Sequence, residues 1–553
     1  MKYFPLKKSL IISLTLLLML LPLTAWGLAS NNIPLDSPVY LYLEKLVGLG
    51  LITSDVKGAR PYAKAEVARL ITEAEVNLAK LDAEAPSLAA ELIMRVREQV
   101  PREMSLRMEP KKAPFLDYNP VDYTRLRYVY VDGIPRSYNR PIYVTGGQKV
   151  FGFIGGNLRP PAITAGVNTQ SGSEGTPLLE NNEGIVYKRG NNGEMRWAME
   201  GFVKDKVSIL VEPLILAETG SDRALMQKGY VKLGSGGLEL EVGRDANWFG
   251  PGYRGATTLT NNAKNFDMVK LSSPEPLDGD WVKRHMGDFK YALIFSRLDE
   301  TGTGADLRQP YFIGVNLRDK PRPWYEIGFH AMRMEGGPGF TGSPSLPDEI
   351  FGGGTTNHNA TTAGFDLRFR IPWLRNTEIY GDYSGSDSAG FWPFVESYVA
   401  GFFIPCLTKS GKDDLRFEFF YGNPKLYVDG KFPAGFVYHG MPFGDSQDGG
   451  ALEFFFRYSH WFSTRNNVAL EYFHTDRGRE GRVSVNSAGE YDPNGVLQAV
   501  EELNAWRAFW TLPLYGDLDM SLMYGWERIN NFNLVGGAKQ TDQTFKMDLS
   551  YRY

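Results

Sequence analysis

Apolar and polar residues alternate with a period of two over most of the chain, from about Pro141 to the carboxyl terminus. The last nine residues show the pattern most clearly, because every second position is apolar or aromatic up to the final tyrosine. The same alternation marks segments 365–371, 414–421 and 518–526. Successive side chains of a β-strand point to opposite faces, so each segment predicts a strand with one apolar and one polar face.

The polar faces of these strands carry charged residues, among them Arg368 and Arg370. An arginine that faces lipid near the middle of a bilayer costs roughly 2–4 kcal/mol, so these faces must point into a wet lumen. A soluble sandwich can also show alternation, but its core face does not usually run on to an aromatic carboxyl terminus. The pattern therefore predicts a mainly β protein, a transmembrane antiparallel β-barrel.

The connections between the predicted strands alternate in length, as expected if periplasmic turns are short and outer loops long. Counted back from Tyr553, with that end in the periplasm, the short connections are 512–517, 462–466, 405–413, 372–376, 318–323, 234–237 and 204–205. The long connections are 527–544, 474–504, 422–450, 333–362, 213–228 and 158–193. Segment 273–287 is long for a periplasmic turn. The count gives about eighteen strands, an even number as in bacterial barrels, with the first near Ile142 to Gly155.

The region before the barrel has a different period. Between Pro34 and about Val100 apolar residues recur every three or four positions, which predicts short amphipathic helices. We expect a periplasmic helical region at 30–110, a linker at 111–140 and the barrel at 141–553. Segment 37–74 resembles half a repeat of the S-layer homology type, which binds wall polymers in some proteins. Contact with a periplasmic or cell-wall polymer is therefore one interpretation, and a plain helical bundle is the other.

The first residues carry an export signal. Three lysines within the first eight residues precede an apolar run from 10 to 23, and small residues follow at Ala25, Gly27 and Ala29. The run is shorter than the roughly 20 residues that a spanning helix needs. We therefore predict a signal peptide at residues 1–29, with an uncleaved anchor helix as the alternative.

Composition narrows the class of protein further. Aromatic residues make up 13% of the chain, yet the mean hydropathy is −0.29, so apolar residues must be interleaved with polar ones. After the leader no apolar stretch is long enough for a spanning helix, which leaves a closed barrel as the way to cross a membrane. The net charge of −4 argues against a nucleic-acid partner. A single cysteine, Cys406, excludes an internal disulfide.

One glycine-rich stretch carries the most specific motif. Residues 243–252 read Gly-Arg-Asp-Ala-Asn-Trp-Phe-Gly-Pro-Gly, and Asn-Asn-Ala follows at 261–263. This resembles the signature of the capsule assembly Wzi family, in which an aromatic pair before Gly-Pro-Gly is followed by Ser-Asn-Asn-Ala or a near variant. Here Phe249 stands in place of the second tryptophan and Thr260 in place of the serine. Further resemblances to the family lie at 379–383, 398–401 and 438–444.

The resemblance implies an outer-membrane barrel of about eighteen strands, plugged from inside, with a periplasmic helical portion. It also implies a role as a lectin that binds nascent capsule or exopolysaccharide at the cell surface. Surface polysaccharide and outer-membrane lipid are then the expected partners. No residue identifies the sugar.

The signature segment also offers the chemistry that binds sugars. By the connection count, residues 244–265 lie at the outer mouth or fold back into the barrel. Aromatic rings cover the apolar faces of sugars, planar polar groups meet their hydroxyls, and arginine meets any carboxylates. The candidate ligand-binding residues are Arg244, Trp248, Tyr253, Arg254, Asn261 and Asn262. The alternative is architectural: Gly-Pro-Gly forms a tight turn, Trp248 packs a plug, and the asparagines satisfy backbone groups.

Two other clusters have competing interpretations. The aromatic residues at 391–394, with Glu396 and Tyr398, could stack on sugar from an outer loop, but aromatic girdles at the membrane interface are commoner in barrels. Asp382 and Asp387 could bind a hard cation such as calcium, or could lie in a solvated turn. We expect no metal and no cofactor.

Catalytic motifs are sparse. The chain has six histidines and lacks the His-Glu-x-x-His, Gly-x-Ser-x-Gly and Walker-type patterns. We therefore expect a glycan-binding protein rather than an enzyme. An outer-membrane porin or polysaccharide export channel is the alternative, because eighteen strands can enclose a pore. Glycoside cleavage by paired carboxylates remains a third hypothesis.

Overall fold

The computed structural model describes residues 28–81, 87–109, 112–144, 166–302, 304, 307–340, 358–389 and 392–552. The predicted signal peptide up to Gly27 lies outside these residues. Leu28 and Ala29, its last two predicted residues, are described and buried. Most of the expected first strand, residues 145–155, also lies outside the description.

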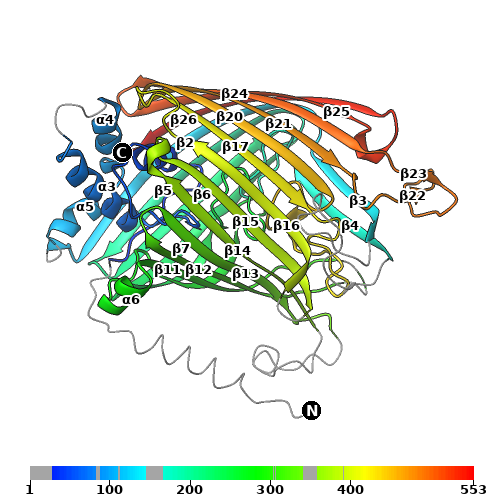
Figure 1. Ribbon diagram of the computed structural model, residues 1–553, viewed down its shortest axis with the longest axis horizontal. Helices are drawn as coiled ribbons and strands as arrows, with labels where there is room; N and C mark the ends of the chain where they lie inside the picture. Colours follow the sequence, from blue (N-terminus) through cyan, green and yellow to red (C-terminus); the bar gives the residue numbers. More distant parts are fainter. Residues whose placement is uncertain are drawn as a thin grey trace, which may run out of the picture.

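Antiparallel strands close into one barrel (Figure 1). Each strand pairs with the next barrel strand along the chain, and the first pairs with the last, as Tyr123 with Arg552. Eighteen strands among the described residues form the barrel: β2 (Leu116–Asp132), β5 (Gly190–Val203), β6 (Val207–Glu218), β7 (Ser221–Ser235), β8 (Leu238–Asp245), β10 (Phe266–Ser272), β11 (Asp288–Arg297), β12 (Tyr311–Arg322), β13 (Tyr325–Glu335), β14 (Asn359–Ile371), β15 (Thr377–Ala389), β16 (Trp392–Ile404), β17 (Asp413–Gly422), β20 (Ala451–Ser463), β21 (Asn466–Arg477), β24 (Glu501–Tyr515), β25 (Leu518–Asn530) and β26 (Lys539–Arg552). The predicted fold class is confirmed.

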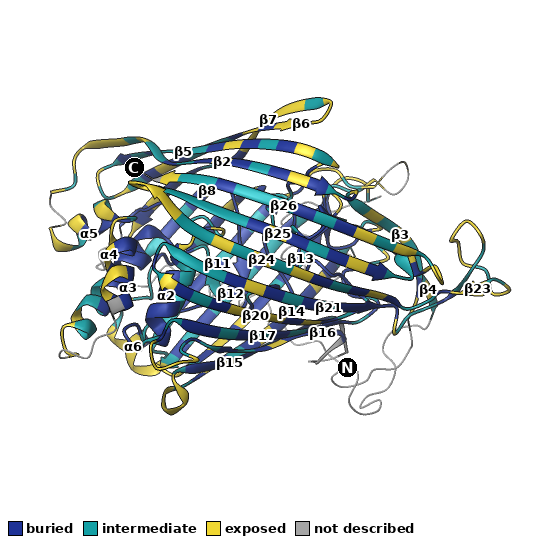
Figure 2. Ribbon diagram, turned by 90° about the horizontal axis from the view of Figure 1, so that it is seen from above, coloured by how far each residue is buried: buried dark blue, intermediate teal, exposed yellow. Residues whose placement is uncertain are grey.

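Burial alternates along the strands, which gives the banding in Figure 2. In β14, for example, Arg368 and Arg370 point inward and are buried, whereas Phe365 and Phe369 are exposed on the outside. The charged faces therefore line the lumen and the apolar faces meet lipid, as the alternation predicted.

Seven of the connections between successive barrel strands are short turns at one end of the barrel, here called the short-turn end: 204–206, 236–237, 323–324, 372–376, 405–412, 464–465 and 516–517. The exception at this end is 273–287, which contains the short helix α6 (Asp280–His285). By the rule of short periplasmic turns, this is the periplasmic end and the opposite one is the outer end.

The expected long connection at 213–228 is wrong. Strands β6 and β7 form a tight hairpin there, with only 219–220 between them. Their register shifts between Glu212 and Pro213, where Gln227 of β7 is the extra residue of a bulge, so the proline that interrupts the sequence pattern lies opposite this bulge and does not end the strand.

The position of the first barrel strand also needs correction. β2 (Leu116–Asp132) lies within the expected linker 111–140, and pairs with both β5 and β26. Its register shifts between Asn119 and Tyr123, around Pro120, which disturbs the alternation in its first half. The expected first strand near Ile142 is instead β3 (Arg136–Val144), which pairs with β4 (Gly166–Gly175) in a separate hairpin.

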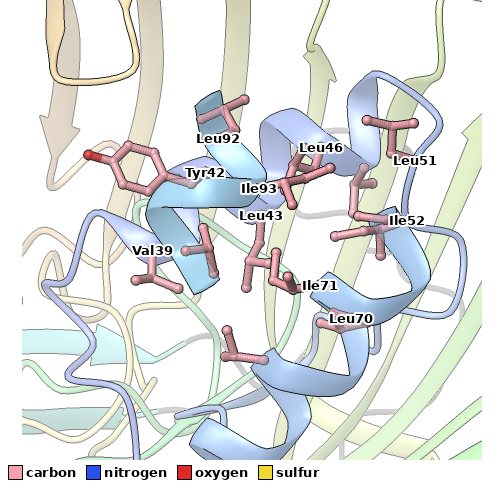
Figure 3. Packing of buried hydrophobic residues seen from close by; sticks show 14 of the residues in the cluster. Val39, Tyr42, Leu43, Leu46, Leu51, Ile52, Leu70, Ile71, Leu92 and Ile93 are labelled. Carbon is pink, nitrogen blue, oxygen red and sulfur yellow. The ribbon is translucent and has the colours of Figure 1, made fainter. Parts of the chain in front are cut away.

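The amino-terminal region is helical, as predicted, and lies at the short-turn end next to the carboxyl terminus (Figure 1). It consists of α2 (Val39–Gly48), α3 (Lys64–Leu78), α4 (Ser87–Arg97) and α5 (Pro101–Met108). Their apolar faces meet in one cluster that includes Leu46, Ile71 and Leu92 (Figure 3). Trp461 of the barrel wall joins this cluster, so the helices are packed onto the barrel. Among the described helices, none has the length and apolar character needed to cross a bilayer.

Short elements lie inside the lumen and at the two ends of the barrel, with η3 in the short turn 372–376. They are β1 (Ala59–Arg60), β9 (Trp248–Phe249), β18 (Val437–Tyr438), β19 (Met441–Pro442), β22 (Ser484–Val485), β23 (Val496–Leu497) and the 3-10 turns η3 (Pro372–Leu374) and η4 (Phe532–Leu534). Segments 246–265 and 423–450 pack together in a second buried cluster, in which Phe443 lies 5.9 Å from Phe266 and 5.1 Å from Phe312.

Candidate functional site

The signature segment, residues 246–265 between β8 and β10, folds back into the barrel. There β9 pairs with β1 of the amino-terminal region, as Trp248 with Arg60. The Arg60 guanidinium lies 4.6 Å from the center of the Trp248 ring and donates hydrogen bonds to the carbonyls of Gly250, at 3.2 Å, and Gly252, at 2.6 Å. Of the two positions allowed by the connection count, the one inside the barrel is therefore correct.

The glycines of this segment allow it to lie close to the wall. Gly250 has a φ of +116°, and a Cβ there would lie 2.9 Å from Asp382 Oδ2. A Cβ on Gly252 would lie 2.0 Å from the carbonyl oxygen of Gly255. A side chain at either position would therefore displace the signature segment from its position inside the barrel.

Arg254 joins the signature segment to two other parts of the molecule. Its guanidinium contacts both oxygens of Glu453 on β20, at 2.5 and 3.0 Å, and also the carboxylate of Glu180. It lies 3.9 Å from the ring center of Phe473. The neighbouring backbone N–H groups, of Tyr253 and Arg254, donate to Glu418 on β17 at 2.6 and 2.8 Å. Arg254 is therefore a buried junction between an inserted loop and the barrel wall.

The two signature asparagines hydrogen-bond to backbone groups. Asn261 Nδ2 donates to the carbonyl of Asn181 at 3.0 Å, and Asn262 Nδ2 donates to that of Pro442 at 3.1 Å. In return, the N–H groups of Glu183 and Gly184 donate to the carbonyls of Asn261 and Asn262. These bonds connect three loops inside the lumen.

Arg244 lies apart from the other five candidates. It is on β8, where it shares the outward-facing side with Val242. Its guanidinium pairs with Asp267 of β10 at 2.8 and 3.0 Å, and both side chains are partly exposed. The structure thus places Arg244 on the outside of the barrel and brings together only Trp248, Tyr253, Arg254, Asn261 and Asn262 in the lumen.

Trp248, Tyr253 and Asn261 line a cavity of about 400 Å³ inside the barrel. This volume lies within the range of roughly 300–1,000 Å³ that is typical of small-ligand sites. Most of the rest of its lining comes from α2, from the segment before it and from the inner faces of β2, β24, β25 and β26. The further aromatic and basic residues around it include Tyr40, Tyr123, Arg125, Arg127, Arg457 and Phe509.

A buried histidine and two aspartates hold the signature segment from the other side. His330 Nε2 lies 2.9 Å from Asp382 Oδ1 and 3.5 Å from Asp366 Oδ2, and its Nδ1 lies 3.0 Å from Thr258 Oγ1. Thr257 donates to Asp382 from its backbone and from its hydroxyl, at 3.1 and 2.8 Å. The expected solvated turn at Asp382 is wrong, because this residue lies in β15 and is buried.

The remaining candidates are less accessible than expected or lie outside the description. Tyr398 is buried, 5.7 Å from the ring of Tyr421, and Glu396 is buried as well. The side chains of residues 391–394, and that of Asp387, lie outside the described part of the chain.

The model of the family described as capsule assembly protein Wzi matches residues 160–544. The chain belongs to the capsule assembly Wzi family. Family membership and the closed barrel place it in the outer membrane, as predicted. Among curated proteins, none matches the sequence.

The solved structure of one outer-membrane protein shares the fold. Wzi of Escherichia coli, described as a carbohydrate-binding β-barrel involved in group 1 capsule assembly, is 15% identical with a TM-score of 0.63. That alignment covers 95% of this chain and 100% of the other. OpdQ of Pseudomonas aeruginosa is 10% identical with a TM-score of 0.42, over 79% of this chain and 97% of the other. OccD3 of the same organism is 11% identical with a TM-score of 0.40, over 79% and 93%.

Sequence reasoning missed several residues around the cavity of this Wzi-family barrel. Tyr123 and Arg125 lie on β2, which was assigned to the linker. The alternation of Tyr123, Arg125 and Arg127 with apolar residues was a readable signal of a lumen-facing strand. Asn181 gave no such signal, because it lies in an irregular loop and reaches the cavity only through tertiary contacts.

The outer loop 423–450 contains a carboxyl group that makes its stability dependent on pH. Burial raises the pKa of Asp445 to about 8, and the nearby Glu453 carboxylate adds to the rise. The pKa in the unfolded chain is about 3.9, so the folded loop binds the proton more tightly. This contribution to stability is present at low pH and is lost as the pH rises from about 4 to about 8. We expect protease cleavage within 423–450 to become faster over this range, and Asp445→Asn to flatten the dependence.

Asp299, in another outer loop, is the matched control. Hydrogen bonds from His439 and Tyr438 lower its pKa, so its contribution is lost as the pH falls. In the Asp299→Asn variant, loop 423–450 should therefore still lose stability and be cleaved faster at high pH. If cleavage of the Asp445→Asn variant depended on pH as in the wild type, Asp445 would not be the cause of the pH dependence.

Proposed function

We propose that this protein binds a surface polysaccharide and attaches it to the cell, acting as a lectin rather than as a channel or an enzyme. The proposal rests mainly on one observation: the barrel is closed and its lumen is filled by inserted segments. The proposal goes beyond membership of the family, because it assigns the attachment of the polysaccharide to this chain.

The filled lumen favours a protein that anchors polysaccharide and argues against a diffusion channel. Segments 28–63, 246–265 and 423–450 lie within the barrel and bury apolar side chains against its wall. Phe249, Phe312 and Phe443 are each almost completely buried in this packing. A diffusion channel needs a continuous wet path, which packed aromatic rings do not provide. We therefore expect no stable conductance in a planar bilayer.

The outer end offers a surface for a polymer. The hairpins β3–β4 and β22–β23 project beyond the barrel (Figure 1). They contact one another, because the Tyr143 N–H donates to the Gly481 carbonyl at 2.8 Å. Tyr143 and Tyr491 are exposed, and the Arg140 guanidinium lies 4.5 Å from the ring center of Tyr138. The exposed rings of Tyr143 and Tyr491 suit the apolar faces of a glycan, and Arg140 suits an acidic group.

The experiment is to delete the gene and measure cell-attached and shed polysaccharide separately. We expect the attached fraction to fall severalfold and the shed fraction to rise, with the total unchanged. Wild-type protein should restore attachment, whereas protein with hairpin 482–498 replaced by a short glycine-serine turn should not. Unchanged attachment after deletion would refute the proposal.

The purified protein and the polysaccharide also test the two other functions, a glycosidase and a channel. Polysaccharide incubated with purified protein should keep its chain length, since a shortened polymer would indicate a glycosidase. Large and stable conductance of the wild-type protein would instead favour the porin or export channel.

A further inference from the structure

One imidazole and two carboxylates from neighbouring strands meet in the barrel wall behind the signature segment. His330 lies on β13, Asp366 on β14 and Asp382 on β15, and all three side chains are buried. Asp366 and Asp382 are directly paired in the strand ladder. One nitrogen or oxygen atom from each residue lies within 4.8 Å of the other two. Strand pairing therefore brings three possible metal ligands to one place.

Two atoms of this group have no hydrogen-bond partner in the described part of the molecule, His330 Nε2 and Asp366 Oδ2. The nitrogen lies 2.9 Å from Asp382 Oδ1, but an N–H at Nε2 would not be aligned with that oxygen. It lies 3.5 Å from Asp366 Oδ2, beyond the usual length of a hydrogen bond. Buried polar atoms nearly always have partners, so these two atoms indicate a bound group.

The signature segment holds the remaining polar atoms of His330 and Asp382. His330 Nδ1 lies 3.0 Å from Thr258 Oγ1, and with its proton on Nδ1 the ring keeps a lone pair on Nε2. The Thr257 N–H donates to Asp382 Oδ2 at 3.1 Å, and the Thr257 hydroxyl donates to Oδ1 at 2.8 Å. Residues that bind metals typically have such partners at their other atoms, which orient them toward the ion.

Arg318 plays the same part for Asp366, because its Nη1 donates to the Oδ1 atom and leaves Oδ2 without a partner. Arg318 Nη2 is also unpartnered, and a water that completes the coordination of an ion could accept from it. With a neutral imidazole, the two carboxylates outweigh the single guanidinium. The group therefore favours a cation over an anion.

The distances indicate which class of cation fits. Ligands of tetrahedral zinc lie about 2.0–2.1 Å from the ion, so that neighbouring ligand atoms are about 3.3 Å apart. The two separations at His330 Nε2, 2.9 and 3.5 Å, lie on either side of this value. Calcium takes about 6–8 oxygen ligands, more than this group provides. An imidazole nitrogen also suits transition metals better than calcium or magnesium.

We propose that His330, Asp366 and Asp382 bind a divalent transition-metal ion of the zinc class, which fastens the signature segment to β13, β14 and β15. The inference is independent of the proposed glycan binding. It departs from the sequence-based expectation of no metal, because the three ligands lie on separate strands and form no local motif. Through Thr257 and Thr258, the ion would also fix the position of residues 246–265 in the lumen.

The test measures the transition-metal content of the full chain, purified in detergent without a polyhistidine tag and refolded with zinc. We expect about one zinc ion per chain, and at least about 10-fold less in His330→Gln. The matched control is His474→Gln, since His474 Nε2 lies 3.2 Å from a single carboxylate, that of Asp476, and the side chain is 28% exposed. This variant should keep the wild-type content. Heat-modifiable mobility on gels checks that each variant is folded.

A second substitution leaves all three ligands in place. Thr258→Val removes only the partner of His330 Nδ1, so we expect the affinity for zinc, measured by competition with a chelator, to fall about 10- to 100-fold. Thr260→Val is its control, because that buried hydroxyl of the same segment donates to the Gly444 carbonyl at 2.6 Å instead. Its affinity should equal that of the wild type.

Three results would overturn the inference. The wild type refolded with zinc might contain no metal, which would leave His330 as an imidazolium between two carboxylates. His330→Gln might keep the wild-type content, in which case zinc binds elsewhere. Equal affinities of Thr258→Val and Thr260→Val would show that His330 is not held as a ligand. Cobalt in place of zinc gives a check on the wild type alone, since the proposed site should produce the visible spectrum of tetrahedral rather than octahedral cobalt.

Discussion

Replacing Asp55 with alanine is expected to release the amino-terminal region from the barrel wall. The Asp55 carboxylate lies 2.8 Å from Lys320, 2.9 Å from Arg368 and 2.8 Å from Arg370, and all these side chains are buried. Burial by itself would raise the pKa of Asp55, but the three cations outweigh it and hold the pKa well below its usual range. Removal of the carboxylate deprives Lys320 of the carboxylate that it contacts, while Arg368 and Arg370 keep contacts with Glu326 and Glu378, and we expect a cost of roughly 3–5 kcal/mol.

The barrel itself should survive this change, because its strands remain paired all the way round. We therefore expect heat-modifiable mobility on gels as in the wild type, together with protease cleavage between residues 28 and 63 and a new conductance in planar bilayers. The control is Glu75→Ala, which breaks a largely exposed pair with Arg97, worth less than about 1 kcal/mol, and should change none of these. If the Asp55→Ala variant resists protease and shows no conductance, apolar packing alone holds residues 28–63 in the barrel.

The barrel wall could be predicted from the sequence because its determinants are local. Along each strand, successive side chains face the lipid and the lumen in turn, so the sequence alternates between apolar and polar residues. Short polar turns separate the strands. Errors arose at Pro120 and Pro213, where a bulge lets a strand continue through a residue that normally ends one. A proline at a bulge and a proline in a loop have the same sequence pattern.

The contents of the lumen could not be predicted in the same way. Asp55 and Arg368 are 313 residues apart, and neither has a local pattern that names its partner. The motif at 243–263 correctly marked a special segment, but proximity in sequence wrongly grouped Arg244 with the residues of the lumen. The alternation of Glu239, Glu241 and Asp245 with outward residues already placed Arg244 on the outer face.

The two arginines of this segment should therefore respond very differently to the same substitution. Arg254→Ala leaves the carboxylates of Glu453 and Glu180 buried without their shared cation, at a cost of roughly 3–5 kcal/mol. Arg244→Ala breaks one partly exposed pair with Asp267, worth less than about 1 kcal/mol. We expect proteolysis of loops 176–189 and 246–265 only in the first variant.

Arg254→Lys refines this expectation, because lysine keeps the charge but lacks the planar fork that contacts both oxygens of Glu453. Its cleavage rate should lie between those of the wild type and Arg254→Ala. Because Arg254 ties the signature segment to the barrel wall, Arg254→Ala should pass small ions in a bilayer while Arg244→Ala stays silent. Equal behaviour of the two alanine variants would show that Arg254 is not the junction between the signature segment and the wall.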